Sequence, residues 1–160
     1  MSLSRRVARP MLAAVFVSGG IDVLRRPGPR AQMAEPVATK LAEPLPLPSD
    51  PEQLVKINAA VQVVAGLLLA LGRFPRLAAT ALAASLVPTT LAGHRFWEIE
   101  DPTQRAQQRI HFFKNMSMLG GLILAMVDTE GAPSLGWWAR RAAGRARTKV
   151  SQAKELLPIS

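Results

Sequence analysis

Seven side chains that could bind a ligand lie within or beside long apolar segments of this sequence. They comprise two charged groups, three amides and two aromatic rings, namely Asp22, Asn58, Gln62, His94, Trp97, Lys114 and Asn115. Histidine can hydrogen-bond a carbonyl oxygen or exchange a proton near neutral pH, and an indole offers a flat face and one N–H donor. If these groups meet in the fold, their chemistry suits the head group of a quinone or of a lipid.

Four apolar segments carry or flank these residues, over 10–24, 54–71, 77–93 and 110–127. A helix that crosses a bilayer needs about 20 mainly apolar residues, and these segments are at or slightly below that length. In the last three segments, apolar residues occupy all sides of the expected helix. A helix of a soluble four-helix bundle instead keeps a polar face. The sequence therefore predicts an all-α, four-helix transmembrane bundle, with the soluble bundle as the alternative.

Composition supports a membrane protein and excludes several classes of chemistry. The mean hydropathy is positive, at +0.15, and the net charge is +9. Such a charge suits nucleic acid, anionic lipid or the cytoplasmic flanks of a membrane protein, but no nucleic-acid-binding motif is present, so no nucleic-acid partner is expected. The absence of cysteine excludes disulfides, thiolate metal sites and thiol–disulfide catalysis by this chain alone.

The remaining segments form one long connection and one tail. The connection, residues 25–53, holds seven of the 13 prolines and is expected to be an extracytoplasmic loop with a short surface helix over 31–42. The tail, residues 134–160, is basic and is either a helix on the lipid surface or a disordered end. The expected membrane domain is therefore 1–133, followed by a basic cytoplasmic tail.

The distribution of Lys and Arg predicts the orientation. Eleven of these residues occupy the N-terminus, the connection between spans two and three and the tail, whereas seven occupy the opposite face. Positive charge accumulates on the cytoplasmic side, so both termini are expected in the cytoplasm of a bacterial plasma membrane. The first segment could also be a signal peptide, but it lacks an A-x-A-like cleavage site and is interpreted as a retained span.

Alternating span directions place the polar residues at one end of the bundle. Asp22 and His94 fall late in outward-running spans, whereas Asn58 and Lys114 fall early in inward-running ones. A charge inside a bilayer costs several kcal/mol, which favours a polar pocket between helices. The alternatives are a lysine that reaches the head groups, an interfacial role for Trp97, and a structural polar network. No ligand spacing supports a metal site.

Several of these elements resemble the DoxX family of small bacterial membrane proteins. The resemblance lies in the first span, in V-A-G-L-L-L-A-L-G-R-F-P-R, in P-T-T-L-A-G-H-R-F-W and in F-F-K-N-M-S-M-L-G-G-L-I-L. It implies a four-span bundle. The name of the family is connected with a subunit of an archaeal thiosulfate:quinone oxidoreductase, and members are linked with membrane-associated redox partners that include superoxide dismutase and sulfurtransferase. By motif match, the positions carried over are His94, Trp97, Lys114 and Asn115.

Two functions follow as hypotheses. The first is a quinone- or lipid-binding subunit of a membrane redox complex, which has no cofactor of its own except a bound quinone and receives electrons from a partner. The second is a non-catalytic membrane anchor or assembly subunit that docks other subunits or soluble redox enzymes. Both make the chain an accessory subunit rather than an independent enzyme. A transporter is disfavoured, because the polar residues do not continue into the inner half of the spans.

Overall fold

The computed structural model describes residues 3–42, 48, 50–128 and 141, and every regular element in these ranges is helical. In chain order the elements are α1 (Leu3–Arg25), α2 (Gly28–Ala42), α3 (Pro51–Ala70), α4 (Pro75–Gly93), the 3-10 helix η1 (Phe96–Glu98) and α5 (Pro102–Val127). The four expected spans correspond to α1, α3, α4 and α5, which confirms the all-α prediction. The compact bundle ends at Val127.

Two helices begin earlier than their apolar segments because aspartate–proline pairs start them. The Asp50 carboxylate accepts a hydrogen bond from the Glu52 amide at 3.0 Å, and the Asp101 carboxylate accepts one from the Gln104 amide at 2.6 Å. Proline follows each aspartate, where its missing N–H is not needed by the helix. The fourth helix therefore begins at Pro102 rather than near residue 110.

A four-residue connection, residues 71–74, joins α3 and α4 and reverses the chain direction. Gly72 and Phe74 take positive φ angles of 68° and 47°, and the Arg73 amide donates to the Leu68 carbonyl at 2.8 Å. Pro75 then opens α4 and disfavours a right-handed helical conformation at Phe74. The reversal agrees with the alternating span directions expected from the sequence.

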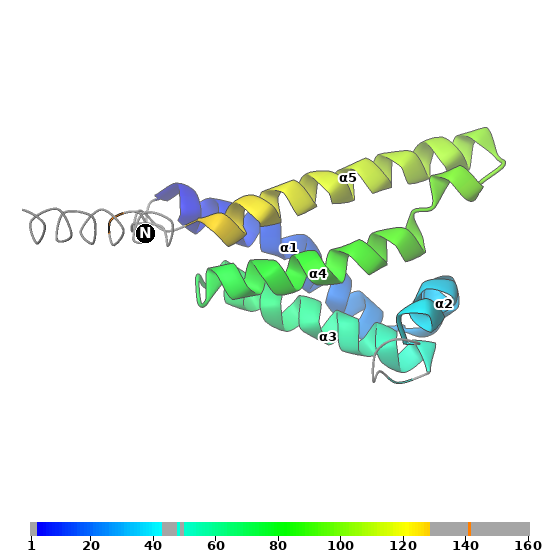
Figure 1. Cartoon of the computed structure of the whole chain (residues 1–160), viewed down its shortest axis with the longest axis horizontal. Coiled ribbons are helices and arrows are strands. Elements are labelled where there is room, and N and C mark those ends of the chain that lie inside the picture. Colours follow the sequence, from blue (N-terminus) through cyan, green and yellow to red (C-terminus); the bar gives the residue numbers. More distant parts are fainter. Residues whose placement is uncertain (1–2, 43–47, 49, 129–140, 142–160) are drawn as a thin grey trace, which may run out of the picture. The chain divides into compact units, whose positions relative to one another are not determined.

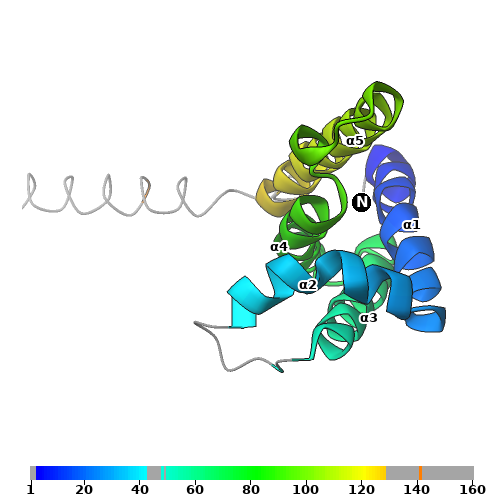
Figure 2. The same cartoon turned by 90° about the vertical axis from the view of Figure 1, so that its right-hand side faces the viewer.

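The four long helices pack in a ring-like order, with α1 on α3, α3 on α4 and α4 on α5, as the end view in Figure 2 shows. The core between them is narrow and rich in alanine. Its buried members are Ala13, Phe16, Ala65, Leu69, Ala78, Ala79, Leu82, Ala83, Leu86 and Leu122. Small side chains let helices approach closely, as is common in membrane bundles.

Large apolar side chains cover the outside of the bundle. Exposed examples occur on each long helix, including Met11 on α1, Val64 on α3, Leu77 on α4 and Leu124 on α5. Each of these helices is long and apolar enough to cross a membrane. Contiguous apolar surface of this kind suits contact with acyl chains rather than water.

Helix α2 lies across one end of the bundle, and both α3 and α4 contact it (Figures 1 and 2). This helix confirms the one expected over residues 31–42, although it starts earlier, at Gly28. The start of α1 and the end of α5 lie at the opposite end (Figure 1). Most of the proline-rich stretch after α2, the expected boundary at residue 133 and all of the tail except Arg141 lie outside the described residues.

Candidate functional site

Two amides of α3 bind hydroxyl groups of α4 near the end of the bundle that α2 covers. Gln62 is buried, and its Nε2 donates to Ser85 Oγ at 2.9 Å and lies 3.4 Å from Thr89 Oγ1. Asn58 Nδ2 donates to the same Thr89 oxygen at 3.0 Å. These bonds fix the rotation of α3 against α4, because amide and hydroxyl must face each other.

An amide of α5 makes the matching contact on another face of α4. Asn115 Nδ2 donates to Thr90 Oγ1 at 3.0 Å, and both side chains are buried. The Thr90 hydroxyl in turn donates to the Leu86 carbonyl at 2.7 Å, as the Thr89 hydroxyl does to the Ser85 carbonyl at 2.8 Å. Each threonine thus uses its proton on its own helix and its oxygen on a neighbouring helix.

The polar groups inside the bundle therefore satisfy one another. Within the described part of the chain, no buried side-chain nitrogen or oxygen lacks a hydrogen-bond partner. Unpaired polar groups are costly in a low-dielectric interior, and pairing removes that cost. Asn58, Gln62 and Asn115 consequently join helices directly, which is the structural network weighed as an alternative to a pocket.

A second cluster forms where α4 ends against the first half of α5. His94 directly follows α4, and its Nδ1 lies 2.6 Å from Gln108 Oε1. The His94 and His111 rings stack with centroids 5.3 Å apart and an interplanar angle of 25°. Lys114 Nζ lies 3.4 Å from His111 Nδ1. His94 is half-buried, whereas His111 and Lys114 are exposed.

Aromatic residues follow both histidines closely in the sequence, and their rings contact one another. Trp97, in η1, is 52% exposed and meets Phe96 and Phe112 edge-on, with centroids 5.2 and 6.0 Å apart. Phe112 also meets Phe96 at 5.5 Å and Phe113 at 5.7 Å. We call this whole region the α4–α5 corner, and its members are His94, Phe96, Trp97, Gln108, His111, Phe112, Phe113 and Lys114.

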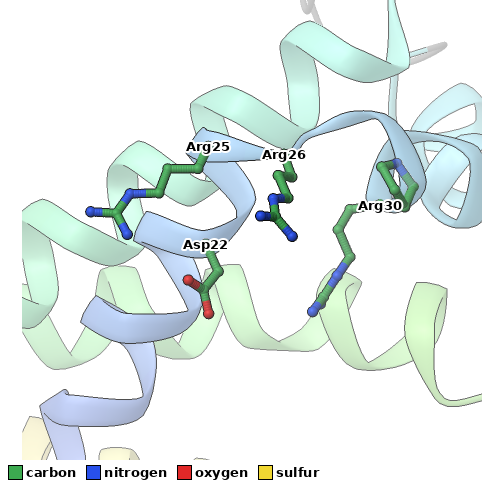
Figure 3. A pocket seen from close by; sticks show the side chains of 5 residues that line it. Asp22, Arg25, Arg26 and Arg30 are labelled. Carbon is green, nitrogen blue, oxygen red and sulfur yellow. The ribbon is translucent and has the colours of Figure 1, made fainter.

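Asp22 does not join the other predicted residues. It is exposed at the end of α1, where it lines a cavity of about 420 Å³ together with Arg25, Arg26, Pro29 and Arg30 (Figure 3). The predicted set is thus divided among three places: the amides between helices, the α4–α5 corner, and this cavity. No group of three His, Asp or Glu residues among the described positions could hold a metal ion.

Sequence reasoning missed Gln108, which holds the His94 ring, and did not assign partners to Ser85 and Thr90. A signal for Gln108 existed, because residues 108, 111 and 115 share one helix face at spacings of three and four. Gln108 lies outside the expected span of 110–127, so the prediction does not include it.

The helices, their apolar outer surface and the polar contacts at one end define a multi-span helical membrane protein. The model of the DoxX family matches residues 5–95, more than half of the chain, and the protein belongs to this family. Neither the curated proteins nor the solved structures contain a match. His94 falls within the matched range, whereas Trp97, Lys114 and Asn115 follow it.

The contact between α4 and α5 can be tested with a double-mutant cycle. We expect Asn115→Leu and Thr90→Val each to lower the free energy of unfolding, with a coupling energy of about 0.6–1.7 kcal/mol, because they share one buried interhelical hydrogen bond. Reversible unfolding in mixed micelles, followed by circular dichroism, would measure it. Strictly additive effects would show that the bond contributes no stability.

Proposed function

We propose that this chain is an accessory subunit of a membrane redox complex and that the α4–α5 corner binds a quinone head group. The observation that supports this most is the stacking of His94 on His111, together with the exposed ring of Trp97 three residues after His94 in the chain. A quinone needs hydrogen-bonding groups for its two oxygens and an apolar or aromatic surface for its ring and tail. The corner offers both at the edge of the bundle, where a ligand dissolved in lipid could enter.

The hydrogen bonds of the two histidines support complementary roles. Gln108 Oε1 accepts from His94 Nδ1, so a neutral His94 ring keeps a lone pair on Nε2. Lys114 donates to His111 Nδ1, so a neutral His111 ring carries its proton on Nε2. One ring can therefore accept from a quinol hydroxyl, and the other can donate to a quinone carbonyl.

The remaining predicted residues have indirect roles in this proposal. Asn58, Gln62 and Asn115 hold α3, α4 and α5 in register and so position the corner without touching the ligand. Asp22 lies at another cavity and has no part in quinone binding. Electrons would pass between the quinone and a redox centre of a partner protein. The complex would lie in a bacterial plasma membrane, with both termini of this chain in the cytoplasm.

A second candidate function is a non-catalytic anchor or assembly subunit. It is favoured by the complete internal pairing of the buried polar groups in the described part of the chain, which needs no ligand. In that case the α4–α5 corner is a structural contact and an interfacial aromatic belt, and the apolar outer surface contacts partner subunits as well as lipid.

Fluorescence of Trp97 provides a direct test of quinone binding. The chain has three tryptophans, and the Trp137→Phe/Trp138→Phe variant leaves Trp97 alone. We expect a short-chain ubiquinone analogue to quench this fluorescence saturably in detergent. His94→Ala and His111→Ala should each weaken binding by about tenfold, since one hydrogen bond contributes about 1–1.5 kcal/mol.

Gln53→Ala supplies the control, because Gln53 is exposed on α3 at the same end of the bundle. Its affinity for the analogue should match that of the parent, and circular dichroism would verify the helix content of every variant. Quenching that never saturates, or equal affinity in the two histidine variants and the parent, would refute quinone binding and leave the anchor function.

A further inference from the structure

The turn between α1 and α2 carries a second polar site, and none of its lining residues is a member of the α4–α5 corner. Three arginines and one aspartate surround its cavity of about 420 Å³. In Figure 3 the side chains of Arg26 and Arg30 extend toward the same space as the Asp22 carboxylate, whereas the Arg25 guanidinium points away from them. The site therefore presents two guanidinium groups to one opening.

Positive charge exceeds negative charge around this cavity. Asp22 is the single carboxylate among its five lining residues, against Arg25, Arg26 and Arg30. Two other cations at this end of the bundle have carboxylate partners, namely Lys56 with Glu52 at 2.6 Å and Arg95 with Glu98 at 3.1 Å. The first turn of α2 contains no acidic residue, so the positive end of its helix dipole adds to the excess.

The position of the cavity at the end of a membrane span determines which anion can reach it. Arg25 is the last residue of α1, and the phosphates of membrane lipids lie at the level where such a span ends. Leu24 directly precedes Arg25 on α1, and Met33 follows Arg30 by three residues on α2. Both are exposed apolar side chains that can contact acyl chains. A lipid at this position therefore places its phosphate against the arginines and its tails against these apolar side chains.

We propose that this cavity binds the phosphate group of one anionic phospholipid. Arg26 and Arg30 would hold the phosphate oxygens, because the planar guanidinium fork matches a phosphate in two parallel hydrogen bonds. Arg25 adds charge nearby, and the Asp22 carboxylate repels a second anion. The proposal does not rest on quinone binding, since no residue is shared with the α4–α5 corner.

Native mass spectrometry of the full chain in detergent, titrated with phosphatidylglycerol or phosphatidylcholine, tests this site. We expect one phosphatidylglycerol to bind at least about tenfold more tightly than phosphatidylcholine, and Arg26→Gln/Arg30→Gln to lose about tenfold or more of that affinity. The control variant, Arg73→Gln/Arg109→Gln, removes the same amount of charge from two other exposed arginines. It should retain the affinity for phosphatidylglycerol. Equal losses in both double variants would overturn the proposal, as would retention by Arg26→Gln/Arg30→Gln.

Two further measurements distinguish a lipid phosphate from a soluble phosphate and test the role of Asp22. Free glycerol phosphate at the same concentration should not displace phosphatidylglycerol, and displacement would assign the site to a soluble phosphate instead. Asp22→Asn alters an exposed residue and should fold normally. It should tighten phosphatidylglycerol binding by about fivefold through loss of one repelling charge, and unchanged or weaker binding would contradict the proposed geometry.

Discussion

Replacing Leu82 by alanine should lower the free energy of unfolding by about 2–5 kcal/mol, the cost of deleting a buried leucine side chain. Leu82 is fully buried on α4 and belongs to the core between the four long helices. Its neighbours Ala78, Ala79 and Ala83 are short, so they cannot extend into the space that the leucine leaves. The cavity would therefore persist, and its cost would add to the lost contacts.

Leu77→Ala on the same helix is the matched control for Leu82→Ala. Leu77 is 71% exposed on the outer surface, where lipid or detergent takes the place of the removed atoms, so we expect a change of about 0.5 kcal/mol or less. Reversible unfolding in mixed micelles, followed by circular dichroism, would compare the variants. Similar losses of unfolding free energy for both variants would mean that the assignment of Leu82 to the core and of Leu77 to the outer surface is wrong.

Adding one methyl group at Gly20 should destabilise the bundle by about 1–3 kcal/mol. A Cβ atom there would lie 2.9 Å from the Ala59 carbonyl oxygen and 2.8 Å from Val63 Cγ2. The carbonyl belongs to the backbone of α3, so α1 and α3 would have to separate. A similar close approach occurs at Gly66, where a Cβ would lie 2.7 Å from Val17 Cγ2.

Gly19→Ala provides the control for Gly20→Ala, because a Cβ at Gly19 meets no atom within 4 Å. We expect Gly19→Ala to be neutral or to stabilise the protein by up to about 1 kcal/mol, since alanine favours a helix over glycine. Thermal unfolding in detergent would rank the two variants and the parent protein. A Gly20→Ala protein as stable as the parent would contradict the close contact between α1 and α3.

The amides and the histidine cluster were predicted at one end of the bundle for a reason that holds for any antiparallel bundle. Each helical residue advances about 1.5 Å along the axis, so its place in the span sets its depth in the membrane. Asn58 near the start of one helix and Thr89 near the end of the next must then lie at similar depths, and they are hydrogen-bonded. This prediction requires only the alternating directions of the spans and no knowledge of how the helices pack.

Which side chains meet at that depth could not be predicted in the same way. Thr89 and Thr90 are adjacent in sequence, yet one contacts Asn58 of α3 and the other Asn115 of α5. Successive residues of a helix point about 100° apart, so the partner depends on how each helix is rotated. Asp22 shows the same dependence, because it lies beside the arginines of the α1–α2 turn instead of the amides.

The sequence by itself determined four apolar helices, their alternating directions and the common end of their polar residues. Only the tertiary structure decided the rotation of each helix, and with it the hydroxyl partners of the amides, the place of Gln108 beside His94, and the separation of Asp22. The physical reason is that each of these helices carries apolar residues on all sides, so hydrophobicity does not distinguish an inner face from an outer one. Close packing at Gly20 and Gly66 and the interhelical hydrogen bonds make that distinction instead.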